Sequence, residues 1–197
     1  MFLSLALTLP ASIQAELGLL RGSLDDVHWM QAEQCLIPLQ NLGQITSRHQ
    51  MEELDMALSH FRWEPFPLSL HQVAHQMGET EDRLTIGLTP RQPIIAFQKR
   101  LSSTLRQAGF PPPRRLLVPE LTIARLAPAS PTDLVPWIQR HNLFHSSEMM
   151  VDHITLLEQL HTDGSTCWRS LEDYPASPEY AIPSLLSPLA EDEDDLL

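Results

Sequence analysis

A carboxylate and a hydroxyl stand two positions apart in the segment Pro119–Arg125, which follows a run of three prolines and two arginines. Glu120 and Thr122 alternate there with the apolar residues Leu121 and Ile123. Alternation with a period of two is typical of a strand with one buried face, so it places the carboxylate and the hydroxyl together on the opposite face. The segment is therefore a candidate strand that presents both groups to a groove.

A second segment, Glu33–Gly43, has the same character in the other half of the chain. Ile37 and Leu39 fall on one face of the expected strand. The other face carries Leu36, Pro38 and Gln40. Two buried strands with a groove-facing side, one from each half of the chain, predict a site shared between the halves.

These segments resemble the paired motifs of the 2H phosphoesterase superfamily, specifically the 2′-5′ RNA ligase or RNA 2′,3′-cyclic phosphodiesterase family. The first motif of that family reads roughly Glu-Asn-Leu-His-Leu-Thr-Leu-x-Phe-Leu-Gly and the second Pro-His-x-Thr-Leu-Ala-Arg. Aligned on these patterns, the first histidine falls on Leu36 and its threonine on Pro38, whereas the second histidine falls on Glu120. Of the four histidine and threonine positions of the two motifs, only Thr122 keeps the residue type.

The resemblance implies a chemistry that this sequence carries only in part. In the family, one histidine is the general base for water, the other protonates the leaving oxygen, and two hydroxyls hold the phosphate. Leu36 cannot transfer a proton, and Pro38 has neither a hydroxyl nor a backbone N–H. Glu120 could accept a proton, but its charge would repel a phosphodiester. Each lost acid or base lowers the rate by about 10²–10⁴.

Three functions remain open at this point. The first is a catalytically degenerate relative that binds an RNA end or a nucleotide 2′,3′-cyclic phosphate. The second is an active hydrolase that uses Glu120 in place of a histidine, and the third is a protein-interaction module that acts through the cleft or the acidic tail. A register shift of one residue would instead bring Cys35 to the first histidine position, but it would turn the core face of the strand into the groove.

Other residues are weaker site candidates. Arg114 and Arg115 precede the second motif and could reach a phosphate at the groove mouth, or could simply be exposed. Histidines at 71 and 75, and at 141 and 145, have spacings that suit one face, but no carboxylate or cysteine completes a metal site. Because the sequence also has no P-loop and no dinucleotide-binding glycine motif, we expect neither a metal nor another cofactor.

Composition limits the class of partner. The net charge is −12, and six carboxylates beyond residue 175, where no lysine or arginine occurs, account for half of it. This charge argues against a general nucleic-acid binder, so we expect no DNA duplex as partner, although a small phosphate pocket is compatible with it. The two cysteines, Cys35 and Cys167, are interpreted as reduced buried thiols of a cytoplasmic, monomeric protein.

The first ten residues have two interpretations. Leucines at 3, 5, 7 and 9 alternate with smaller residues as in a strand, and no positively charged residue precedes them. The alternative is the apolar part of a secretory signal peptide with a cleavage site near Ala15. We favour the strand, and no apolar run reaches the roughly 18 residues of a membrane span.

The remaining pattern predicts an α+β domain. We expect helices that begin near Pro10, near Thr46 or Ser47 and near Pro93, and a fourth within 131–142. We expect hairpins of strands 66–77 with 83–89 and 149–160 with 165–171. The resemblance implies the bilobal 2H phosphoesterase (LigT-like) fold: two pseudo-symmetric lobes with antiparallel sheets flanking a central cleft, helices outside, in residues 1–175. Residues 176–197 are predicted to be a disordered acidic tail rich in Pro and Ser.

Overall fold

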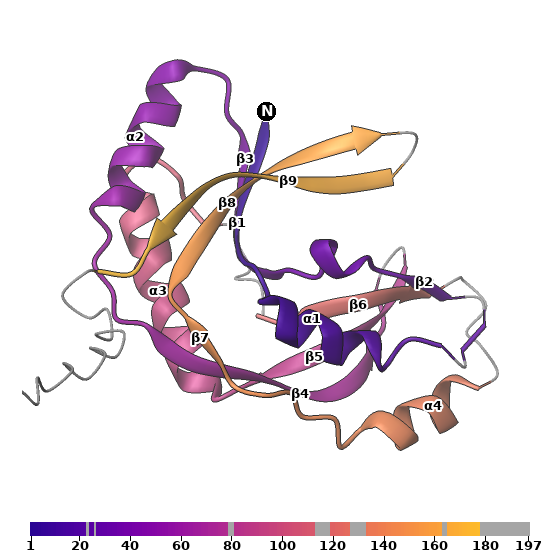
Figure 1. Cartoon of the computed structure of the whole chain (residues 1–197). Helices are drawn as coiled ribbons and strands as arrows, with labels where there is room; N and C mark the ends of the chain where they lie inside the picture. Colours follow the sequence, from indigo (N-terminus) through magenta and orange to yellow (C-terminus); the bar gives the residue numbers. More distant parts are fainter. Residues whose placement is uncertain are drawn as a thin grey trace, which may run out of the picture.

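The structure is a computed structural model that describes residues 1–22, 24–25, 27–78, 81–112, 119–126, 133–162 and 165–177. Its described part consists of two antiparallel sheets with helices packed outside them (Figure 1). This agrees with the predicted α+β class. The expectations for Arg114 and Arg115, for the turn at 163–164 and for residues 178–197 lie outside the described residues.

The first sheet has the order β3-β1-β8-β9. Its strands are β1 (Phe2–Leu7), β3 (Ile37–Gln44), β8 (His153–Thr162) and β9 (Ser165–Pro175). The leucine alternation at the beginning of the chain forms a strand as predicted, because Leu3, Leu5 and Leu7 are all buried. The N-terminal segment therefore lies in the middle of a sheet, between β3 and β8.

The second sheet has the order β2-β6-β5-β4-β7. Its strands are β2 (Val27–Trp29), β4 (Phe66–Gln76), β5 (Asp82–Thr89), β6 (Leu121–Leu126) and β7 (Met149–Val151). The predicted hairpin of β4 and β5 is confirmed. The two motif strands thus belong to different sheets, β3 to the first and β6 to the second.

The single strand expected over 149–160 is wrong. Met149–Val151 forms β7 and pairs with β4 of the second sheet, whereas the chain from His153 pairs with β1 of the first sheet. Only Asp152 separates the two strands. Alternation along a sequence shows which side chains are buried but not which strand is the partner, so the change of sheet had no sequence signal.

Four α-helices are described: α1 (Ala11–Gly18), α2 (Arg48–Ser59), α3 (Arg91–Gln107) and α4 (Leu134–His141). Helix α2 begins with a capping box, in which Ser47 accepts from the Gln50 N–H and the Gln50 side chain accepts from Ser47 N–H. Helix α3 ends before Gly109, whose φ of 88° suits glycine. Helices α2 and α3 lie side by side (Figure 1), and α4 contacts β4.

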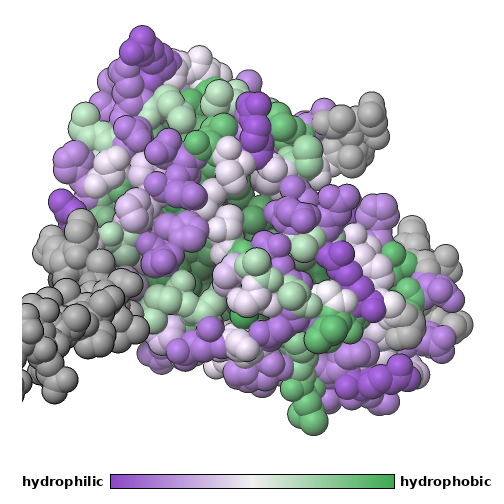
Figure 2. Space-filling model, viewed as in Figure 1, coloured by the Kyte–Doolittle hydropathy of each residue, from purple (hydrophilic) through white to green (hydrophobic). Residues whose placement is uncertain are grey.

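One continuous hydrophobic core connects these elements. Near α3 it contains an aromatic cluster in which the Trp63 and Phe97 ring centroids are 4.8 Å apart and those of Phe66 and Phe97 are 5.3 Å apart. Trp29 of β2 packs against Trp137 of α4 at 5.6 Å. Hydrophilic side chains cover most of the face in Figure 2, with apolar ones scattered between them.

The described chain ends in contact with this core. Ser177 donates its N–H to the Trp63 carbonyl, and Ser177 Oγ accepts from Trp63 N–H, both at 3.1 Å. Ordered contacts therefore extend two residues past Pro175. None of the helices in the described ranges is long and apolar enough to span a membrane.

Candidate functional site

A cavity of about 380 Å³ lies where the two sheets face each other. Ser4, Ala6 and Trp168 line it from the first sheet and Arg83 from the second. Three of the four residues at the motif positions line it as well, namely Leu36, Pro38 and Thr122. Glu120 is half-buried before the start of β6 and is not among the lining residues. The structure thus brings together all the motif positions except the one with a carboxylate.

The strand β6 departs from simple alternation. Thr122 pairs with Thr85 and Ala124 with Leu84, so Ile123 is an extra, bulged residue without a partner on β5. The bulge puts Thr122 and Arg125, three positions apart, on the cavity wall. Ala124, which simple alternation would put on the same face as Thr122, is fully buried. A bulge changes the facing of every later side chain, and sequence alternation alone did not reveal it.

Two arginines on this wall were missed by the sequence reasoning. Arg83 of β5 and Arg125 of β6 are directly opposite each other, and both line the cavity. Arg125 Nε lies 3.6 Å from Glu81 Oε2. Within the described residues, the side chain of Arg83 forms no hydrogen bond or ion pair. Opposed like charges destabilise a strand pair, whereas guanidinium groups bind phosphate well. The last residue of the second motif was a signal for Arg125, but none pointed to Arg83.

On the opposite side of the cavity, the side-chain amide of Gln34 forms two hydrogen bonds to the backbone of Trp168. Gln34 Oε1 accepts from Trp168 N–H at 2.8 Å, and Gln34 Nε2 donates to the Trp168 carbonyl at 3.4 Å. Residues Ala32–Gln34 are a short 3-10 helix, so the strand expected from Glu33 starts only at Ile37. This turn is tied to β9, and both Gln34 and Trp168 line the cavity.

The alternative register with Cys35 at the site does not agree with the structure. Cys35 is 2% exposed and is not a lining residue, whereas Leu36 is. Burial raises the pKa of the Cys35 thiol, although nearby Arg21 acts in the opposite direction. Both cysteines are free, but Cys167 is only half-buried, so the prediction of two buried thiols is correct for Cys35 alone.

The ionisable side chains that line the cavity are the two arginines. Among the described residues that form its wall there is no imidazole, carboxylate, thiol or phenol. Arginine stays protonated in proteins and only donates hydrogen bonds. The wall can therefore hold an anion with guanidinium, hydroxyl and amide groups, whereas a proton transfer would need a group from elsewhere.

The histidines form no comparable site. His75 Nε2 lies 2.9 Å from Asp82 Oδ2, and His141 Nδ1 bonds the Trp137 carbonyl. The structure pairs His71 with His145 instead of the spacings noted in the sequence, with ring centroids 5.8 Å apart. Over the described ranges, no group of three or more potential metal ligands gathers.

A family model decides the relationship. The model of the 2′-5′ RNA ligase superfamily matches residues 38–163, which is more than half of the chain. The chain belongs to this superfamily. The family resemblance that was inferred from the two motifs is thereby confirmed. A comparison with curated protein sequences found no match.

Solved structures share the fold. The structure of E. coli LigT complexed with 3′-AMP is 19% identical, with a TM-score of 0.70 over 89% of this chain and 98% of that one. The structure of TT0787 of Thermus thermophilus is 18% identical, with a TM-score of 0.68 over 89% and 97%. At this identity the likeness concerns the fold alone, and it confirms the predicted bilobal fold of the 2′-5′ RNA ligase superfamily.

Proposed function

We propose that this protein is a non-catalytic member of the superfamily that binds the phosphate of a nucleotide or of an RNA end in the cleft between its two sheets. The observation that carries the proposal is the opposed pair Arg83 and Arg125, on the same wall as Thr122. A fork of guanidinium donors next to a hydroxyl suits phosphate oxygens.

Among its described residues, the wall opposite the arginines lacks groups that could transfer a proton. Leu36 and Pro38 occupy the first motif there, and neither can accept or donate a proton. Glu120, the alternative base, does not contribute to the described wall. Two missing proton-transfer groups would together lower the rate by about 10⁴–10⁸ if their effects multiplied. Binding without hydrolysis is the activity that remains.

The arginine pair favours a terminal phosphate over a cyclic one. A terminal phosphomonoester carries close to two negative charges at neutral pH, whereas a 2′,3′-cyclic phosphate carries one. The cavity of about 380 Å³ is within the usual size range for small-molecule sites. Structures of E. coli LigT with 3′-AMP and with phosphate give a precedent for such ligands in this fold.

Calorimetric titration with 3′-AMP, with 2′-AMP and with adenosine tests the proposal. We expect both nucleotides to bind and adenosine to bind at least tenfold more weakly. Arg83→Gln and Arg125→Gln should each weaken nucleotide binding, and Arg91→Gln, an exposed arginine in the first turn of α3, is the matched control. Equal affinity for adenosine, or turnover of 2′,3′-cyclic AMP, would contradict the proposal.

A further inference from the structure

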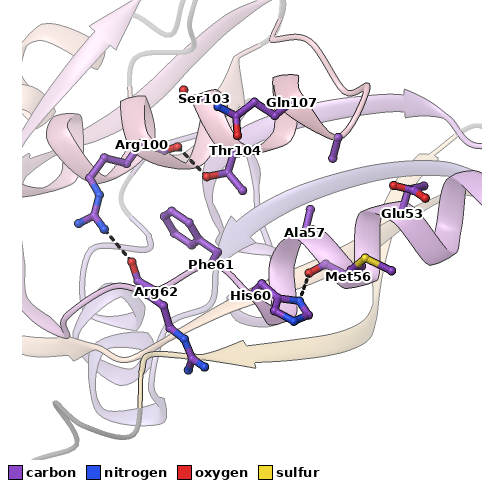
Figure 3. Close-up of a pocket in the computed structure, with 11 residues that line it drawn as sticks. Glu53, Met56, Ala57, His60, Phe61, Arg62, Arg100, Ser103, Thr104 and Gln107 are labelled. Carbon is purple, nitrogen blue, oxygen red and sulfur yellow. Dashed lines mark hydrogen bonds between the residues drawn. The ribbon is translucent and has the colours of Figure 1, made fainter.

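A groove of about 690 Å³ runs between α2 and α3, separate from the cleft (Figure 3). Arg62 and Arg100 line one end of it, and Glu53 lies toward the other end in Figure 3. Polar side chains of Ser103 and Thr104 lie along its α3 side. None of its lining residues lines the cleft.

At the cationic end of the groove, the Arg100 guanidinium is held in place by its neighbours. Arg100 Nη2 donates to the Arg62 carbonyl at 2.7 Å, and the Arg100 guanidinium carbon is 5.8 Å from the centroid of the Phe61 ring. One hydrogen bond leaves most of the five guanidinium N–H donors available. Arg62 and Arg100 are both exposed, so both present donors to solvent.

A second groove of about 400 Å³ shares Arg62 and Arg100 with the first and is also lined by Trp63. Trp63 is the residue that holds Ser177, through the two backbone-directed hydrogen bonds of 3.1 Å. The last described residue is therefore attached to the neighbour of Arg62, at the point where the two grooves meet.

Charge distinguishes the helix from the segment that follows Ser177. Helix α3 contains four cations, Arg91, Lys99, Arg100 and Arg106, and no Asp or Glu. Residues 178–197 contain six carboxylates and no Lys or Arg, and five of the carboxylates are consecutive at 191–195. This segment also carries leucines, and the groove offers the exposed Met56 and the ring of Phe61 as apolar contacts.

We propose that residues 178–197 dock in the groove between α2 and α3, with the carboxylates of 191–195 paired to Arg62 and Arg100. Thirteen residues, 178–190, separate Ser177 from this run, and a linker of that length has a root-mean-square end-to-end distance of about 20 Å. The 17-residue helix α3 is about 25 Å long, so the run reaches the groove. Tethering gives it an effective concentration on the order of millimolar. An external polyanion would instead approach a protein with a net charge of −12.

Paramagnetic relaxation in the full chain tests this docking. A spin label is attached to Leu197→Cys in a Cys167→Ser background, since Cys35 is buried. At low salt we expect loss of the amide signals of Ala57, Ser103 and Thr104, with those of α4, on the other side of the molecule in Figure 1, unchanged. At about 0.5 M NaCl the signals should return, because surface ion pairs are screened.

Matched variants test whether the loss of amide signals depends on Arg62 and Arg100. The signals should return in the double variant Arg62→Gln/Arg100→Gln, and stay lost in Arg106→Gln, an exposed arginine of α3 that does not line the groove. Replacing the carboxylates of 191–195 by Gln and Asn changes only residues outside the described fold, and it should also restore the signals. No loss at low salt, or loss that is insensitive to Arg62 and Arg100, would overturn the proposal.

Two further outcomes also count against it. Recovery in Arg125→Gln but not in the groove variants would place the segment in the cleft. Signal loss in an unlabelled ¹⁵N copy mixed with a labelled copy would show docking on a second molecule.

Discussion

At the scale of single residues, the strongest feature of the cleft is the opposed pair of arginines, of which Arg125 has an ion-pair partner in Glu81. Arg83 and Arg125 face each other on adjacent strands, and the Glu81 carboxylate lies 3.6 Å from Arg125. Like charges in this position cost stability, and an anion between them would remove that cost. The binding of an anion and the stability of the fold are therefore linked at this pair.

Thermal unfolding with inorganic phosphate measures this linkage. A ligand at one hundred times its Kd adds about 2.7 kcal/mol of stability. For a chain of this size this corresponds to a rise in Tm of about 5–10 °C. We expect the rise in the native protein and in Arg91→Gln, and its loss in Arg83→Gln without a fall in the Tm of the free protein. An equal rise in all three would show that phosphate acts elsewhere.

Glu120 is the residue that separates a binding protein from an altered enzyme. Since it does not line the cleft, Glu120→Gln should change neither the background turnover of 2′,3′-cyclic AMP nor the affinity for 3′-AMP. Turnover in the native protein that disappears in Glu120→Gln would identify Glu120 as a general base.

At the scale of elements, the cleft strand β3 is fixed from behind by α3. Gln40 lines the cleft, yet its side chain accepts from Ser102 Oγ at 2.7 Å and donates to the Phe110 carbonyl at 3.2 Å. Gln98 of the same helix donates to the Leu39 carbonyl at 2.7 Å. The helix thus holds both the backbone and a side chain of the strand that carries the first motif.

Ser102→Ala tests this support. It would leave the buried Gln40 oxygen without its hydroxyl donor, which costs about 1–3 kcal/mol. The neighbouring Ser103 is exposed on the same helix, so Ser103→Ala should change the free energy of unfolding by less than about 0.5 kcal/mol. Urea unfolding of the two variants gives the comparison. Equal effects would mean that the hydrogen bond from Ser102 to Gln40 does not support β3.

The elements also show how far the sequence was sufficient. The helix cap at Ser47, the leucine strand at the N-terminus and the β4–β5 hairpin follow from local residue patterns, and all three are confirmed. The bulge at Ile123 and the change of sheet at Asp152 depend on which strand lies alongside, and local pattern contains no such information. The same limit hid Arg83, which becomes a site residue only when β5 is placed against β6.

At the scale of the whole molecule, side-chain bonds tie the first sheet to the helices outside it. Tyr174, in the last strand of the described chain, donates its hydroxyl to Asp55 Oδ1 of α2 at 2.9 Å. Burial raises the pKa of Tyr174 above its ordinary value of 10.0, and the hydrogen bond and charge of Asp55 act in the same direction. The protonated hydroxyl therefore stabilises the fold.

The raised pKa determines how stability depends on alkaline pH. Below about pH 10 the tyrosine is protonated in both states, and its contribution is complete. Above that pH the unfolded chain releases the proton first, so the contribution is lost as pH rises toward the folded pKa.

Urea midpoints at pH 7, 9, 10 and 11 would reveal this dependence. Tyr174→Phe should lower stability at pH 7 by about 0.5–1.5 kcal/mol through the lost hydrogen bond. It should also make the fall in stability between pH 9 and 11 shallower than in the native protein. If Tyr174→Phe kept the native slope, the hydrogen bond between β9 and α2 would not be the source of the alkaline sensitivity.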